Sequence, residues 1–264
     1  MTMKLGCCLN MLGDSREPVG RRYMDTLRRA GYDYMELPLA QIMALTETEF
    51  RKLLDEIHMS GIPCECCNNF FPASVRLTGE EADSLKISEY VKQAMDRAER
   101  MGVKIIVFGS SGAKNVPDGF ACSRAFCQVA DTLRFIDTLA LPAGIRIAME
   151  PLNRKESNMI CSLEEGKLLL READSASACL LVDYYHFFME KESFKTLEKL
   201  ASDIIHVHFA DPAGRSFPAA PCEAYERFFA VLKNSGYDGR VSIEAYAKEP
   251  EKEIEKAVWI RQYF

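Results

Sequence analysis

IRIAME, residues 145–150, is a short apolar run that ends in a metal-capable side chain, and such a run occurs four times in the second half of the chain. The other three are LLVD (180–183), IIHVH (204–208) and VSIE (241–244). The final side chains belong to Glu150, Asp183, His208 and Glu244. Successive members are 33, 25 and 36 residues apart, about one strand, loop and helix per step. We therefore expect each to close a consecutive strand of one barrel and all four to converge at its rim.

These four side chains have the chemistry of a metal site. Three carboxylates and an imidazole suit a hard divalent cation such as Mn²⁺ or Mg²⁺. Taken singly, Asp183 and Glu244 could cap helices, and Glu150 could meet a surface Arg. Together, three buried acids would repel one another without a cation or protons. His206 shares a strand face with His208 but lies deeper, so we interpret it as a second-layer or core histidine.

The rest of the chain repeats strands and amphipathic helices. Four further strand candidates precede the metal-capable runs: KLGCCLN (4–10), YDYMEL (32–37), IPCECC (62–67) and VKIIVFG (103–109). Helix-length segments with apolar residues at three- and four-residue spacing lie between them, and Gly61 and Gly102 are expected to end two of these helices. Eight such units in 264 residues predict an α/β fold, a single (β/α)8 TIM-barrel domain over residues 1–264. An open doubly wound sheet is the structural alternative.

Composition argues against several classes of partner. The net charge is −6 and the Lys and Arg residues are scattered, so no basic face for nucleic acid is expected. Apolar stretches fall short of the ~20 residues that span a bilayer, and the start, MTMKLGCCLN, lacks the features of a secretory signal. We therefore expect a cytoplasmic protein that binds neither nucleic acid nor membranes.

Two local patterns could be read as binding sites. In Cys64-Glu65-Cys66-Cys67, strand alternation would place Cys64 and Cys66 on one face and Cys67 on the other, which disfavours a zinc site and favours buried, reduced thiols. The loop GSSGAKNVPDG (109–119) could present amides and Lys114 to an anion such as phosphate, or it could be a plain surface connection. It is not a phosphate-loop motif.

Longer stretches around the four residues carry a family resemblance. They are AMEPLNRKES (148–157), LVDYYHF (181–187), HVHFADPAGR (206–215) and SIEAY (242–246). The chain resembles the xylose-isomerase-like barrel superfamily, particularly its sugar-phosphate isomerase/epimerase and ketose 3-epimerase branches. The resemblance implies that the four residues bind one divalent cation and that Glu156, His186 and Arg215 contact substrate. Arg215 lies seven residues beyond His208, one more than in the epimerase pattern.

The resemblance implies a metal-dependent isomerase or epimerase that acts on a sugar or sugar phosphate, with Mn²⁺ as the expected metal, Mg²⁺ or Co²⁺ as alternatives, and a homodimer as the assembly. A ketose bound to the metal through its carbonyl and an adjacent hydroxyl would form an enediolate, with Glu150 and Glu244 as the acid/base pair. Proton return to the opposite face gives an epimer, and return to the neighbouring carbon gives an isomer. Glu36, at the end of the second strand, could bind another hydroxyl, or it could be a surface or salt-bridged acid.

Other activities use the same scaffold. An inosose-type dehydratase or a hydroxypyruvate isomerase remains an alternative, and so does a carbohydrate-binding barrel without catalysis. A metal-dependent endonuclease is disfavoured because such enzymes use a histidine-rich trinuclear zinc centre, whereas this acidic chain has four histidines. Incorporation of solvent deuterium into the substrate separates an enzyme from a binder.

Overall fold

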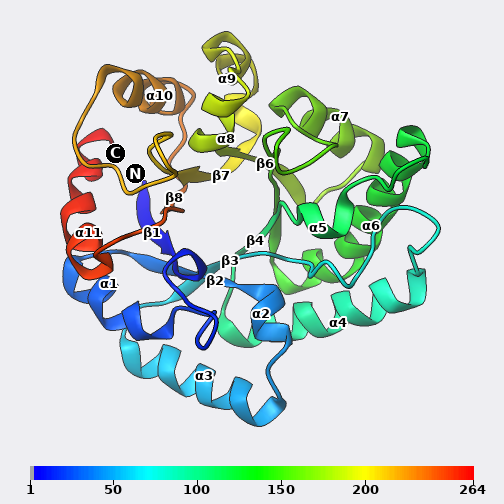
Figure 1. Cartoon of the computed structure of the whole chain (residues 1–264), viewed down its shortest axis with the longest axis horizontal. Coiled ribbons are helices and arrows are strands. Elements are labelled where there is room, and N and C mark those ends of the chain that lie inside the picture. Colours follow the sequence, from blue (N-terminus) through cyan, green and yellow to red (C-terminus); the bar gives the residue numbers. More distant parts are fainter. Residues whose placement is uncertain (1–2) are drawn as a thin grey trace.

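Eight parallel strands close into one barrel in sequence order in the computed structural model, which describes residues 3–264 (Figure 1). The strands are β1 (Lys4–Cys8), β2 (Tyr34–Pro38), β3 (Cys64–Asn68), β4 (Ile105–Phe108), β5 (Arg146–Met149), β6 (Ala178–Asp183), β7 (Ile204–Phe209) and β8 (Arg240–Ile243). Pairing of β1 with β8, from Lys4–Arg240 to Cys7–Ile243, leaves no open edge. The predicted (β/α)8 barrel is confirmed, and the open doubly wound sheet is wrong.

Helices surround the barrel (Figure 1). They are α1 (Met24–Ala30), α2 (Leu39–Met43), α3 (Glu47–Ser60), α4 (Ser84–Met101), α5 (Ser111–Lys114), α6 (Cys122–Ala143), α7 (Leu163–Ala173), α8 (Tyr184–Met189), α9 (Phe194–Leu200), α10 (Glu223–Asn234) and α11 (Pro250–Ala257). Thr46 and Glu49 form a capping box at the start of α3, which ends at Gly61 with φ 70°. Gly102 ends α4 in the same left-handed conformation, so both predicted helix ends are confirmed.

Two sets of side chains alternate along the strands: one set fills the interior of the barrel, and the other packs against the surrounding helices. The inward cluster comprises Tyr34, Cys66, Ile105, Val107, Ala148 and Leu181. A Cβ at Gly6 would overlap the Tyr34 ring, so glycine is needed for this ring to cross the barrel. The Tyr34 hydroxyl is 2.7 Å from Ser242 Oγ, and it therefore has a polar partner although the ring is fully buried.

The cysteines of β3 differ from the expected arrangement. A register shift opposite Met35 and Glu36 pairs these residues with Cys64 and Cys66, which leaves one extra residue on β3. Cys66 consequently faces the barrel interior, whereas Cys64 joins Cys67 in the outer core. The predicted pairing of Cys64 with Cys66 on one face is therefore wrong, because strict alternation does not hold across a bulge. Within residues 3–264, none of the metal-capable groups contains these three thiols.

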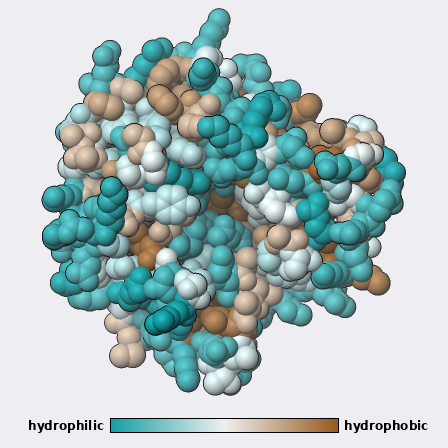
Figure 2. All heavy atoms as spheres, viewed as in Figure 1, coloured by the Kyte–Doolittle hydropathy of each residue, from teal (hydrophilic) through white to brown (hydrophobic). Residues whose placement is uncertain are grey.

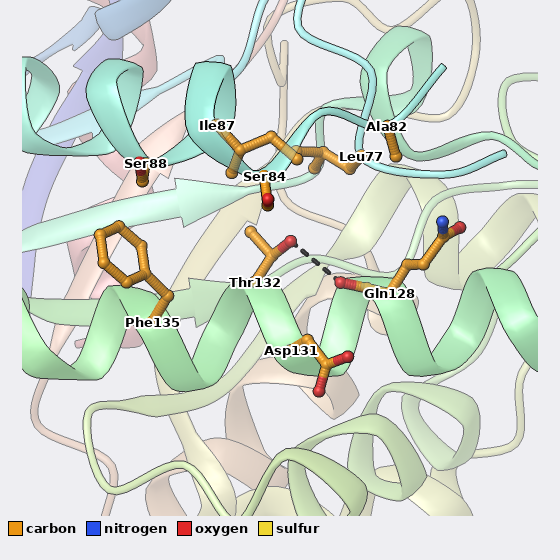
Figure 3. Close-up of a pocket in the computed structure, with 9 residues that line it drawn as sticks. All are labelled: Leu77, Ala82, Ser84, Ile87, Ser88, Gln128, Asp131, Thr132 and Phe135. Carbon is orange, nitrogen blue, oxygen red and sulfur yellow. Dashed lines mark hydrogen bonds between the residues drawn. The ribbon is translucent and has the colours of Figure 1, made fainter. Parts of the chain in front are cut away.

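The outer surface offers one apolar cavity between α4 and α6, of about 300 Å³ (Figure 3). Its walls include Ile87 of α4 and Phe135 of α6, and Thr132 donates a 2.9 Å hydrogen bond to the Gln128 carbonyl. No residue of the predicted site lines it. The face drawn in Figure 2 is mostly hydrophilic, with apolar residues in small groups. Among the helices of residues 3–264, none combines the length and apolar character that a bilayer crossing requires.

Candidate metal centre

Four side chains meet at the carboxyl ends of the last four strands. Asp183 is the last residue of β6, His208 lies near the end of β7, and Glu150 and Glu244 directly follow β5 and β8. One ligand atom from each lies within 4.8 Å of the other three. All four are buried, with relative exposures between 0 and 6 %. The structure thus brings the predicted ligand set to one point at the rim.

His208 shows why a positive charge belongs at this point. Its Nε2 is 2.9 Å from Glu36 Oε1, while Nδ1 is 3.2 Å from both Glu150 Oε1 and Glu244 Oε2. Carboxylates only accept hydrogen bonds, so Nε2–H donates to Glu36 and Nδ1 faces two acceptors. Burial opposes the charged imidazole, yet the Glu36 carboxylate raises the pKa of His208 well above its usual value. Either a proton or a metal ion at Nδ1 relieves the repulsion, and the donor set fits a divalent cation.

The two glutamates beside His208 have different electrostatic surroundings. Burial raises the pKa of Glu150 above its ordinary value. Glu244 is equally buried, but the charges of Arg215 and His208 overcome that effect and lower its pKa to about 2. Two carboxyl groups with opposed shifts at one site are typical of acid/base pairs.

Arg215 places a guanidinium over this centre. One Nη contacts Glu244 Oε2 and lies 3.2 Å from Asp183 Oδ2, and the other is 3.6 Å from Glu156 Oε2. The guanidinium also stacks over the Tyr185 ring, 4.9 Å from its centroid. The carboxylates of Asp183 and Glu244 would repel each other unless a positive charge lay between them. In this structure the Arg215 guanidinium supplies that charge.

The loop that carries Arg215 has a fixed path in spite of its additional residue. Asp211 and Ser216 exchange backbone hydrogen bonds of 2.8 and 3.2 Å, and Tyr246 N–H donates to the Arg215 carbonyl at 2.8 Å. Arg215 itself has a positive φ of 49°. These hydrogen bonds hold the loop in a path that keeps the Arg215 guanidinium in contact with Asp183 and Glu244.

His186 presents an unused donor near Asp183. The Asn153 backbone N–H and side-chain Nδ2 approach its Nδ1 at 3.2 and 2.8 Å, so Nδ1 accepts and the proton resides on Nε2. Nε2 is buried and has no hydrogen-bond partner among residues 3–264, although Asp183 Oδ2 lies 3.4 Å away outside bonding geometry. Asn153 Nδ2 also contacts Glu156 Oε1 at 2.8 Å. His186, Glu156 and Arg215 thus surround the centre on one side.

Asn68, at the end of β3, is a site residue that our sequence reasoning missed. Its Nδ2 donates to Glu244 Oε1 at 3.2 Å and to Asn10 Oδ1 at 2.8 Å. Its Oδ1 is buried without a partner. The signal was available, because Asn68 lies at the carboxyl end of a strand, as the four predicted ligands do.

Two predicted residues lie elsewhere than expected. Lys114 is fully buried and donates to the Gly109 carbonyl, so in this conformation it offers no surface to phosphate, and the plain loop alternative is favoured. Glu36 is also fully buried, beneath His208, with protein donors on both carboxylate oxygens. The salt-bridged alternative agrees with its pairing to His206 and His208, whereas this position is inconsistent with a surface acid and with a direct contact to a substrate hydroxyl.

The chain is similar in sequence and in fold to several proteins named as sugar epimerases. A family model described as xylose isomerase-like TIM barrel matches residues 24–263. The L-ribulose 3-epimerase of Methylomonas sp. (strain DH-1) is 25% identical over 248 residues, 92% of this chain and 84% of the relative. The ketose 3-epimerase of Arthrobacter globiformis is 23% identical over 249 residues, which cover 93% of this chain and 84% of the relative. The crystal structure of D-allulose 3-epimerase from Methylomonas sp. with D-allulose superposes with a TM-score of 0.86 at 20% identity, covering 100% of this chain and 98% of that one. The chain belongs to the xylose isomerase-like TIM barrel family.

Proposed function

We propose that this protein is a divalent-metal-dependent isomerase or epimerase of a small polyhydroxy ketone or its phosphate. The observation that carries the proposal is the pair Glu150 and Glu244, each 3.2 Å from the same His208 nitrogen within a buried four-ligand cluster. The epimerase names of the relatives support the same reaction class.

Glu150, Asp183, His208 and Glu244 would hold the metal, for which Mn²⁺ is our first choice and Mg²⁺ or Co²⁺ are alternatives. The bound cation would polarise the ketone and an adjacent hydroxyl and so acidify the C–H bond of the hydroxyl-bearing carbon. All other steps are assigned to the protein's own side chains.

Proton transfer is assigned to the two glutamates. Of Glu150 and Glu244, one takes the proton from one face, the C–H electron pair moves into the enediolate of the substrate, and the other, in its protonated form, returns a proton from the other face to give the epimer. Return to the neighbouring carbon would give the aldose–ketose isomer instead. The Asn68 amide would hold the Glu244 carboxylate in orientation through its 3.2 Å hydrogen bond.

Substrate orientation is assigned to the residues on the Asp183 side. His186 Nε2–H, which has no protein acceptor, would donate to a substrate oxygen. Arg215 would donate to a second oxygen, and the Glu156 carboxylate would accept from a hydroxyl. These contacts would fix which carbon lies between Glu150 and Glu244.

Exchange with deuterated water tests the proposal. Ketopentoses, ketohexoses and their terminal phosphates are incubated with the enzyme and Mn²⁺, and one deuterium is expected on the carbon beside the ketone. Glu150→Gln should abolish the exchange and keep the fold, whereas Glu255→Gln, at an exposed position of α11, should leave it unchanged. Full exchange in Glu150→Gln would remove Glu150 from the mechanism.

The same assay separates the alternatives. A dehydratase would release a product lighter by one water, and a hydroxypyruvate isomerase would act only on the three-carbon substrate. A carbohydrate-binding barrel without catalysis would bind a sugar and leave its carbon-bound hydrogens unexchanged.

A further inference from the structure

A buried polar network lies directly beneath the candidate metal centre. Its middle is the Glu36 carboxylate: Oε1 accepts from His208 Nε2 at 2.9 Å, and Oε2 accepts from His206 Nε2 at 2.8 Å and from Ser242 Oγ at 2.6 Å. Tyr34 extends the chain, 2.7 Å from Ser242 Oγ. All five side chains are fully buried. Glu36 stands on β2 and the histidines on β7, with β1 and β8 between them, so the carboxylate spans the interior.

This arrangement needs an explanation beyond packing. A carboxylate without access to water costs several kcal/mol unless its charge is compensated, and an apolar side chain would fill the same volume without that cost. None of the proton transfers or substrate contacts proposed above uses Glu36. Its charge is matched to the two imidazole N–H groups, and only one of these belongs to a predicted metal ligand.

The hydrogen bond to Oε1 determines what His208 offers to the centre. A neutral imidazole carries its proton on one nitrogen, and the other nitrogen has the lone pair. With Nε2–H held by Glu36, the lone pair is on Nδ1, which lies 3.2 Å from Glu150 and from Glu244. The Cys8 thiol also lies 3.7 Å from Nε2, but it is a much weaker acceptor than a carboxylate. The choice of tautomer therefore depends on Glu36.

We propose that Glu36 is the positioning residue of the metal centre: it holds His208 as the Nε2–H tautomer and thereby directs the Nδ1 lone pair at the cation. His206 and Ser242 anchor the opposite oxygen and stop the carboxylate from rotating away. The inference rests on the proposed function only in requiring that a divalent cation binds at Glu150, Asp183, His208 and Glu244. It adds a residue from β2 to a centre otherwise built from β5 to β8.

Mn²⁺ binding, followed by the electron paramagnetic resonance signal of the free ion, tests this role without any substrate. Glu36→Gln keeps the shape of the side chain and removes its charge, and we expect the Mn²⁺ affinity to fall about 10- to 100-fold. Glu255→Gln is the matched control, because it removes the same charge at an exposed position of α11 outside the buried network. Its affinity should stay within about three-fold of the parent, well below that loss. Circular dichroism verifies the fold of each variant.

The unmodified protein supplies a second test that does not depend on a variant folding. With only four histidines, the ring nitrogens are resolvable by ¹⁵N NMR, and diamagnetic Mg²⁺ can replace Mn²⁺. On adding Mg²⁺, we expect the His208 Nδ1 resonance to shift while Nε2 remains protonated. A His208 ring that keeps a proton on Nδ1 and responds at Nε2 would overturn the inference, and so would full Mn²⁺ affinity in Glu36→Gln. If the parent protein binds no Mn²⁺ at all, the proposed function fails together with this inference.

Discussion

Gly109 lies against Glu150, one of the two carboxylates that we assign to proton transfer, and Gly109→Ala should displace that carboxylate. An alanine Cβ would overlap Glu150 Oε2 and lie 3.2 Å from Glu150 Cδ and 3.4 Å from Leu152 Cδ2. Unbonded heavy atoms need about 3.5 Å, so the carboxylate has to move by roughly 1 Å, and Leu152 restricts where it can go. A misplacement of about 1 Å costs on the order of 100-fold in rate, or about 2.7 kcal/mol of barrier.

The assay is the rate of deuterium incorporation at saturating Mn²⁺, together with the Mn²⁺ affinity, because Glu150 is assigned to both tasks. Gly31→Ala is the control: its φ of +86° makes alanine strained, but nothing lies within 4 Å of the added Cβ. It should lower stability by about 1 kcal/mol and leave exchange per folded molecule intact. Wild-type exchange in Gly109→Ala would refute the assignment of Glu150.

Two further predictions concern Lys114 and the metal. Burial lowers the pKa of Lys114 from 10.5 to about 8. Below about pH 8 the charged side chain therefore lowers the stability of the folded protein by the full amount. This destabilisation decreases as the pH rises and is absent above about pH 10.5. Lys114→Met should therefore raise the free energy of unfolding at pH 7 by up to about 3 kcal/mol, and this gain should disappear by about pH 10.5. Urea titrations at several pH values measure it, and a gain that does not change with pH would contradict the prediction. Mn²⁺ at about 100 times its Kd should stabilise the protein by about 2.7 kcal/mol, seen as a higher Tm that EDTA reverses. Asp183→Asn should lose this gain, and an unchanged Tm in the parent protein would argue against a metal centre.

Much of the architecture was predictable because it depends on local patterns. Short apolar runs at spacings of one strand and one helix indicate a parallel barrel, and residues at the ends of such strands must share one rim. Glu150 and Glu244 could be assigned to one site in this way although 94 residues separate them, from position 150 to 244. Gly61 and Gly102 marked helix ends for an equally local reason, since glycine tolerates the left-handed conformation that ends a helix.

The level at which each inward side chain lies along the barrel axis could be learned only from the tertiary structure. The period of a strand indicates that Glu36 points inward, but not which side chains on β7 and β8 stand at the same level, because that depends on the register between strands distant in sequence. The bulge on β3, which moves Cys64 to the outer face, has no signature in CECC.

What the sequence by itself determined was the set of strands and the chemistry at their ends, because period and residue type are local properties. Only the tertiary structure decided that Lys114 is buried, that Glu36 accepts a hydrogen bond from His208 and that Arg215 contacts Asp183. Those outcomes depend on which loops and strands pack together, and a hydrogen bond between side chains such as Glu36 and His208, 172 residues apart, exists only after the barrel has closed.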